Sequence, residues 1–142
     1  MKGFTLIEIM LALAITTILF AFTVPIYLIF QNRNDLDIAA NTMAQDYRRA
    51  QLLSQAVDGD ASWGVKVQSG EITIFRGDDF DFRDRDYDEN LEMPTSITAS
   101  GTTETVFEKF TGYPRSPGTL TLMSPNNETR TITLNEKGIV SY

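Results

Sequence analysis

Glu8 is the residue of this chain whose type and position most clearly predict chemistry. It stands immediately before Ile9–Phe30, a run of 22 residues without a charged side chain. A helix rises about 1.5 Å per residue, so this run is long enough to cross a hydrocarbon core of about 30 Å. A carboxylate at the edge of lipid is costly unless it is paired, so we expect Glu8 to have a cationic partner. The simpler alternative is an acid that only complements the helix dipole, which is worth about 0.3–1 kcal/mol at a surface.

A second group of acids lies in the stretch 78–89, which holds seven acids, two arginines and three aromatic residues. Asp84, Asp86 and Asp88 have the alternate spacing that begins a calcium-binding EF-hand loop. The glycine that such a loop needs at its sixth position and the glutamate at its twelfth are missing. The stretch therefore favours a solvated connection whose aromatic residues pack on a sheet while its arginines offset some of the acids. A lateral contact with another subunit is the further alternative.

The composition excludes most enzymatic chemistry. The chain has neither cysteine nor histidine, which removes thiol nucleophiles, disulfide bonds, and the commonest general base and metal ligand. No pair of carboxylates comes with any sign of a pocket, so we expect a protein that is not an enzyme and has no cofactor, unless calcium binds at the acids named above. The formal net charge of −7 opposes contact with nucleic acid.

One long helix, predicted from residue 4 to about 57, must position Glu8. Pro25 lies inside its apolar half and removes one backbone donor there. Beyond the polar residues 31–35, apolar residues recur at spacings of three, four or seven, which is typical of a helix with one buried face. These residues are Leu36, Ala40, Met43, Tyr47, Ala50 and Val57, with Ser54 in the one gap. The opposite face is predicted to carry Asp37, Gln45, Asp46, Arg48 and Arg49.

After the helix, the period of the apolar residues changes to two. Gly59 is predicted to end the helix as a left-handed cap. Residues 63–68 and 72–75 alternate on either side of Ser69-Gly70, which predicts a β-hairpin. Further strands are predicted at residues 91–93, 96–99, 105–110 and 119–123, and a last hairpin joins 129–134 to 139–142. The result is an α+β fold in which a long N-terminal helix packs on a C-terminal antiparallel β-sheet.

The first residues also carry a family resemblance. Gly3-Phe4-Thr5-Leu6-Ile7-Glu8-Ile9-Met10 resembles the processing signature of type IV pilins and type II secretion pseudopilins. The resemblance implies that a membrane aspartyl peptidase cuts between Gly3 and Phe4 and methylates the new Phe4 amine. It implies that Glu8 is the glutamate used in filament assembly and that Pro25 marks a place where the helix can melt or stretch. The segment 43–51 is similar to the corresponding helix of the H-type minor pseudopilins.

The resemblance implies four parts: a cleaved leader (1–3), a transmembrane helix half (4–30), an amphipathic helix half (31–58) and an antiparallel β head (59–142). It implies a structural subunit, single-pass in the cytoplasmic membrane before assembly and part of a cell-surface or extracellular filament afterwards. The implied partners are other copies or other pilin subunits, the prepilin peptidase, an inner-membrane platform and an assembly ATPase.

Two other functions remain open at this point. Some relatives with this kind of head act as DNA-uptake receptors through basic residues near the last hairpin, where this chain offers only Lys137. The other alternative is a monomeric, membrane-anchored binding module, against which a processed and methylated Phe4 would argue. The sequence fits a pilus and a secretion pseudopilus equally, and a major and a minor subunit equally.

Overall fold

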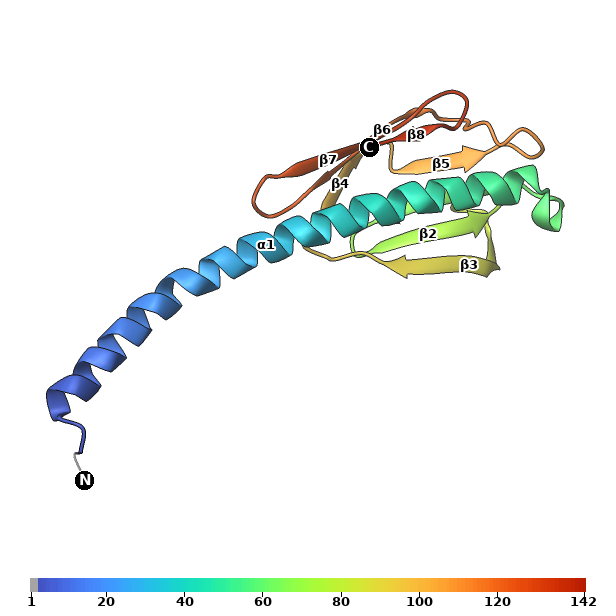
Figure 1. Ribbon diagram of the computed structural model, residues 1–142. Coiled ribbons are helices and arrows are strands. Elements are labelled where there is room, and N and C mark those ends of the chain that lie inside the picture. The colour runs from blue at the N-terminus through green and yellow to red at the C-terminus, as the bar shows by residue number, and fades with distance from the viewer. Residues whose placement is uncertain (1–2) are drawn as a thin grey trace.

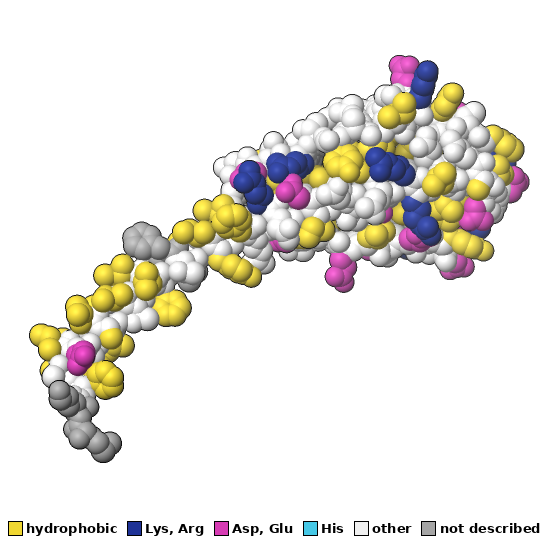
Figure 2. All heavy atoms as spheres, viewed as in Figure 1, with side chains coloured by type: hydrophobic (Ala, Val, Ile, Leu, Met, Phe, Trp, Pro, Cys, Tyr) yellow, Lys and Arg dark blue, Asp and Glu magenta, His cyan; other side chains and the backbone are white. Residues whose placement is uncertain are grey.

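One long helix, α1 (Leu6–Gln55), forms a stalk that continues along the head domain in the computed structural model, which describes residues 3–142 (Figure 1). The large apolar side chains of the stalk are exposed, and Figure 2 shows hydrophobic side chains along its length with a single acidic side chain near its beginning. This helix is long and apolar enough to cross a membrane, with a mean hydropathy of 2.4 over 18 residues. Met1 and Lys2 of the predicted leader lie outside the described residues.

The helix is continuous through Pro25, although this residue has no amide to donate. Thr16, Thr17 and Thr23 donate their hydroxyls to carbonyls four residues earlier, over 2.7 Å for Thr17 and 2.9 Å for Thr23. These bonds satisfy the hydroxyl groups within the helix itself, as an apolar environment requires. These three threonines therefore need no partners outside the stalk.

The second half of α1 buries one face against the head. The predicted stripe from Leu36 to Ser54 is confirmed, and it also includes Ala39 and Ala44. Val57 does not belong to the stripe because the helix ends at Gln55. The predicted cap at Gly59 is also wrong. Val57, with φ of 57°, is the first left-handed residue after the helix, a strained conformation for a β-branched side chain, and Gly59 follows with φ of 65°.

Ser54 joins the end of α1 to two strands at once. Its hydroxyl oxygen accepts a hydrogen bond from the Trp63 amide over 2.9 Å and lies 3.1 Å from the Phe107 carbonyl oxygen, to which the hydroxyl donates. Ser54 is completely buried. The polar residue in the gap of the apolar stripe is therefore a buried connection between the helix and the head.

We expect Ser54→Ala to lower the free energy of unfolding of the purified full-length chain in detergent by about 1–3 kcal/mol, because it leaves a buried amide and a buried carbonyl without their partner. Chemical denaturation of wild type and variant measures the difference. The control is Ser69→Ala, an exposed serine in a turn, which should change the free energy by less than about 0.5 kcal/mol. Equal stabilities of the Ser54→Ala protein and the wild type would contradict this role.

The head contains two four-stranded antiparallel sheets instead of the one sheet that was predicted. The first sheet has the order β3-β2-β1-β5 and the second the order β4-β6-β7-β8. The strands are β1 (Trp63–Gln68), β2 (Glu71–Arg76), β3 (Asp84–Glu92), β4 (Thr98–Gly101), β5 (Glu104–Phe107), β6 (Gly118–Met123), β7 (Thr129–Leu134) and β8 (Val140–Ser141). Both predicted hairpins, β1–β2 and β7–β8, are confirmed by their pairing. β3 and β4 belong to different sheets, and Pro94 lies between them, where it cannot donate to a continuing ladder.

The acidic stretch forms more regular structure than predicted. Its second half is β3, which pairs with β2 along the edge of the first sheet, so the prediction of a strand at 91–93 alone is wrong. Phe80 packs edge-on against Phe75, with ring centroids 5.4 Å apart, as expected for an aromatic residue covering the sheet. Phe82 does not pack in this way, since it is 92% exposed. The solvated connection is therefore limited to the residues before β3.

Two ion pairs join the stalk end of the head to α1. The Arg33 guanidinium lies 3.4 Å from the Glu128 carboxylate, and Arg130 donates to Asp37 over 2.7 Å. Both strand-side partners lie at or beside the start of β7, next to the place where the stalk leaves the head. The head is thus attached to the helix from residue 33 onward.

Candidate functional site

The first candidate site is the beginning of α1. Thr5 is the residue that caps the helix, with extended backbone angles. Its hydroxyl accepts from the Glu8 amide and its own amide donates to the Glu8 carboxylate, each over 3.4 Å. This reciprocal pair is a capping box. The Thr-x-x-Glu spacing of residues 5–8 is a local signal for such a cap, and the role of Thr5 was not predicted from it.

Gly3 and Phe4 precede the helix, lie outside any regular secondary structure and are exposed. A Cβ atom added to Gly3 would meet no atom within 4 Å, and Phe4 is 82% exposed. Both residues that flank the peptide bond are therefore open to solvent, and the described part of this chain imposes no requirement for glycine at position 3. A requirement for glycine there would have to come from another protein.

Glu8 has apolar surroundings. A shallow pocket of about 350 Å³ adjoins it, lined otherwise by Phe4, Ile9, Ala12, Leu13 and Thr16. Within residues 3–30, Glu8 has the one charged side chain. Residues 3–30 therefore offer Glu8 no cationic side chain, and a cation that pairs with it must come from outside this segment. The structure places Gly3, Phe4 and Glu8 together at this end, while Pro25 lies well along the stalk.

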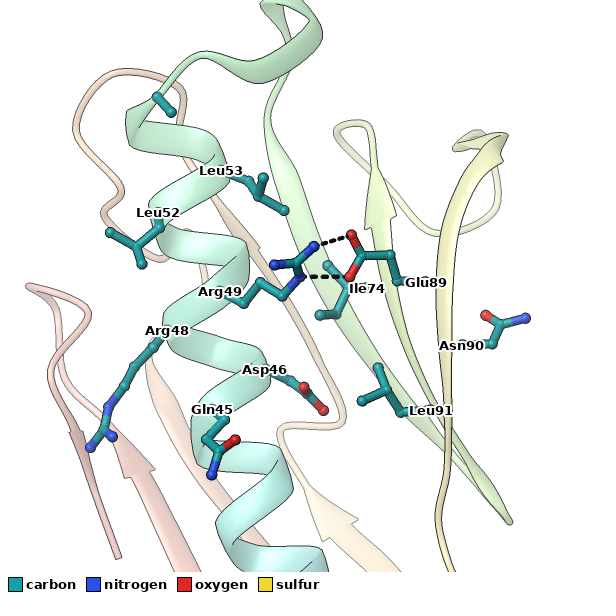
Figure 3. A pocket seen from close by; sticks show the side chains of 11 residues that line it. Gln45, Asp46, Arg48, Arg49, Leu52, Leu53, Ile74, Glu89, Asn90 and Leu91 are labelled. Carbon is teal, nitrogen blue, oxygen red and sulfur yellow. Dashed lines mark hydrogen bonds and ion pairs between the residues drawn. The ribbon is translucent and has the colours of Figure 1, made fainter.

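The second candidate site is a groove of about 760 Å³ between α1 and the edge strand β3, which we call the α1–β3 groove (Figure 3). Leu53, Ile74 and Leu91 provide its apolar lining. Arg49 spans the groove and donates two hydrogen bonds to the Glu89 carboxylate, each over 2.6 Å. The arginine lowers the pKa of Glu89, chiefly through these hydrogen bonds. Sequence reasoning gave no signal for this pair because its members lie far apart along the chain.

Asp46 is the unusual residue of the groove. The sequence predicted it on the outer face of the helix, but it is only 4% exposed, and that prediction is wrong. Its Oδ2 atom has no hydrogen-bond donor among the described residues. Burial, and then repulsion from Glu89, raise the pKa of Asp46 to about 6, although Arg49 acts in the opposite direction. The fold thus keeps a poorly solvated carboxylate whose charge is not fully compensated.

The three acids with EF-hand spacing do not converge. They lie at the start of β3, where Asp84 pairs with Arg76 and the Asp88 carboxylate accepts from Arg83 over 2.8 and 3.0 Å. No group of three acids that could hold a metal ion occurs among the residues that the structure describes. Two of the three candidate ligands therefore already have cationic partners.

We expect millimolar calcium to leave the melting temperature of the chain unchanged, because binding would have to displace Arg76 and Arg83 from their carboxylates. Differential scanning fluorimetry with and without calcium, at ionic strength matched with sodium chloride, measures this. A rise of several degrees that disappears in the Asp86→Asn variant would show instead that the acids bind calcium.

Comparisons with known proteins agree with these features. Residues 1–24 match the model of the prokaryotic N-terminal methylation motif. No curated protein sequence gives a significant match. Among solved structures, the minor pseudopilin EpsH from the type 2 secretion system of Vibrio cholerae is similar, with a TM-score of 0.55 and 12% sequence identity over 75% of this chain and 94% of that one. Together these findings confirm the predicted resemblance and the predicted α+β fold.

Proposed function

We propose that this chain, which carries the prokaryotic N-terminal methylation motif on a pseudopilin-like fold, is a structural subunit of a type IV pilus-like or pseudopilus filament. The observation that carries the proposal is the isolated charge of Glu8 at the start of an exposed, apolar helix and within the matched motif. An exposed apolar surface of this size is stable only in lipid or against other helices. The two environments correspond to the subunit before and after assembly.

Before assembly, the stalk of α1 spans the cytoplasmic membrane and the head lies outside it. A prepilin peptidase hydrolyses the bond between Gly3 and Phe4, and the new Phe4 amine is methylated but keeps its positive charge. An inner-membrane platform and an assembly ATPase then lift the subunit into a bundle of stalks. The heads coat this bundle and form the surface of the filament. The function is structural, and no step of it requires catalysis by this chain.

The amine of Phe4 is the cation that Glu8 needs. When a new subunit enters the bundle, its amino terminus leaves water for an apolar environment and requires a counter-charge there. Glu8 of a neighbouring subunit is the one charged group that residues 3–30 of this chain can offer. Pairing the two charges brings adjacent helices into a fixed axial register.

We expect Gly3→Val to block cleavage, because a peptidase that approaches the backbone closely has no room for a branched side chain. The open surroundings of Gly3 mean that the substitution does not disturb this chain itself. Intact-mass measurement of protein from cells that carry the peptidase should give a start at methylated Phe4 for wild type and at Met1 for the variant. A wild-type protein that starts at Met1 in such cells would refute the proposed processing.

A further inference from the structure

The distance between the apolar stalk and the head is short. The uncharged run Ile9–Phe30 is about 33 Å long as a helix, which matches a hydrocarbon core of about 30 Å. α1 continues without interruption from this run into its buried face, which begins at Leu36. Leu36 lies about 9 Å beyond Phe30 along the helix axis. No linker separates the stalk from the head, so the head is held close to the end of the apolar run.

The turn between β6 and β7 reaches closer still. This turn, residues 124–128, is the part of the head nearest the stalk in Figure 1. Its last residue, Glu128, lies 3.4 Å from the Arg33 guanidinium, and Arg33 is about 4.5 Å beyond Phe30 along the helix axis. The headgroup layer of a bilayer is about 5–7 Å thick on each side of the hydrocarbon. When the stalk spans a membrane, the β6–β7 turn therefore lies at the level of the headgroups.

The exposed residues of this turn are uncharged and their backbone is held in place. Pro125, Asn126 and Asn127 are exposed, and side-chain amides can donate to phosphate oxygens and accept from ammonium groups. The Ser124 amide donates to the Glu128 carbonyl over 2.9 Å, and the Asn127 amide donates to the Ser124 carbonyl over 3.0 Å. The turn thus presents two amide side chains from a fixed position toward the end of the apolar run.

The charges around the β6–β7 turn nearly cancel. The charged side chains at this level are Arg33, Asp35 and Asp37 of α1, Glu128 of the turn and Arg130 of β7. Two ion pairs use four of them, and Asp35 forms none among the described residues. The first sheet, on the other side of α1 in Figure 1, has Glu71 directly opposite Glu92 at its stalk end, and neither has an ion pair there. An anionic lipid surface therefore repels the first sheet more than the turn, which favours a tilt toward the turn.

We propose that the β6–β7 turn rests in the phospholipid headgroup layer before assembly, with the Asn126 and Asn127 amides donating to headgroup phosphates. The inference rests on the membrane-anchored state in the proposed function. The contact sets the tilt of the head relative to the membrane surface. It exists only while the stalk is in the bilayer, and it is given up when the subunit enters a filament.

Fluorescence quenching at a single cysteine tests the contact, and the natural chain has no cysteine to interfere. The full-length Asn126→Cys chain is labelled with a small fluorophore and reconstituted into vesicles of phosphatidylethanolamine and phosphatidylglycerol. Lipid that carries a spin label on its headgroup should quench this fluorophore strongly. The matched control is Thr111→Cys, an exposed position beside Gln55 at the far end of α1, where the same label should not be quenched. Equal quenching at the two positions would overturn the contact.

An added charge distinguishes lipid from another occupant of the turn. Asn127→Asp adds one negative charge at nearly unchanged shape, and aspartate, like asparagine, tolerates the φ of 60° at this position. In the labelled Asn126→Cys chain it should lower the equilibrium constant for headgroup contact about fivefold more in vesicles with phosphatidylglycerol than in vesicles of phosphatidylcholine alone. An equal loss in both kinds of vesicle would refute a contact with lipid. Disulfide-linked dimers of the unlabelled Asn126→Cys chain on mild oxidation would show that the turn faces a second copy instead.

A label in the stalk separates this inference from the function on which it rests. Leu19→Cys, labelled in the same way, should be quenched by lipid that carries a spin label on its acyl chain. Quenching at position 19 without headgroup quenching at position 126 would refute the contact and leave the membrane-anchored state standing. A label at position 19 that no lipid quenches would refute both.

Discussion

The Glu8→Leu protein should be cleaved, methylated, inserted into the membrane and folded, and yet be absent from filaments. The substitution removes the one charge of the stalk and makes the apolar run longer, so the subunit sits in the bilayer at least as stably as wild type. The head domain begins far along the chain and does not contact residue 8. The amine of an incoming subunit, however, would meet no counter-charge within the bundle, a loss of about 3–5 kcal/mol for a buried ion pair missing one partner.

The capping box provides the matched control for this experiment. Glu8 also caps α1 through the Thr5 amide, so Glu8→Leu removes a cap as well as a charge. Glu8→Gln keeps a side-chain oxygen that can accept from Thr5, but it carries no charge. If the charge pair sets the axial register of the helices, both variants should be absent from sheared filaments. Immunoblots of membranes should still show normal amounts of both variant proteins. Assembly of the Gln variant at wild-type levels would show that the cap is what matters and would falsify the charge-pair mechanism.

The Asp46→Asn head should be more stable than wild type at neutral pH, by about 1–2 kcal/mol. The pKa of Asp46 is raised to about 6, above the value of 3.8 for an unhindered group, so the folded state binds a proton more tightly than the unfolded state. The contribution of Asp46 to the free energy of unfolding is therefore fully present below about pH 4 and is lost as the pH rises to about 6. A pKa shift of this size corresponds to a cost of about 2–3 kcal/mol for keeping the ionised carboxylate in the folded state. The uncharged amide of asparagine avoids part of this cost.

Denaturation curves of both proteins between pH 4 and 8 measure this effect. The difference between variant and wild type should grow from pH 4 to 6 and then remain constant. Taking the difference cancels the opposite contributions of Asp60 and Asp78, whose pKa values are lowered by hydrogen bonds to cationic or polar partners and which do not interact with Asp46. The control is Asp35→Asn, since Asp35 is an acid of the same helix that lies outside the groove. A variant that is less stable than wild type at pH 8 would show that the charge of Asp46 stabilises the monomer.

Short-range patterns predicted much of this molecule. The apolar run, the stripe on α1 and the two hairpins depend on spacings within one element, and each is present in the structure. Glu8 could be singled out for the same reason, because a lone acid beside an uncharged run is visible in the sequence itself. Even the missed capping box was a local signal, since Thr5 and Glu8 are three residues apart.

The features that were missed depend on which segments meet in space. Asp46 is a charged residue between polar neighbours in the sequence, which is typical of a solvated helix position, but the folded head leaves it only 4% exposed. β3 itself lacks the apolar alternation of a strand. It is held as a strand by pairing with β2, by the ion pair of Asp84 with Arg76, and by the Arg76 guanidinium 3.4 Å above the Tyr87 ring. Such partners are separated by long stretches of chain and leave no periodic signal.

The attachment of the head from residue 33 onward determines how a filament of these subunits responds to a pull. Beyond Leu36 the helix cannot lengthen without giving up its buried face, whereas the stalk is held by its own hydrogen bonds, one of which Pro25 cannot make. Each residue that passes from helix to extended chain lengthens the stalk from about 1.5 to about 3.3 Å. In the filament proposed above, extension under tension would therefore be confined to the stalks, and the heads would keep their shape while the fibre lengthens.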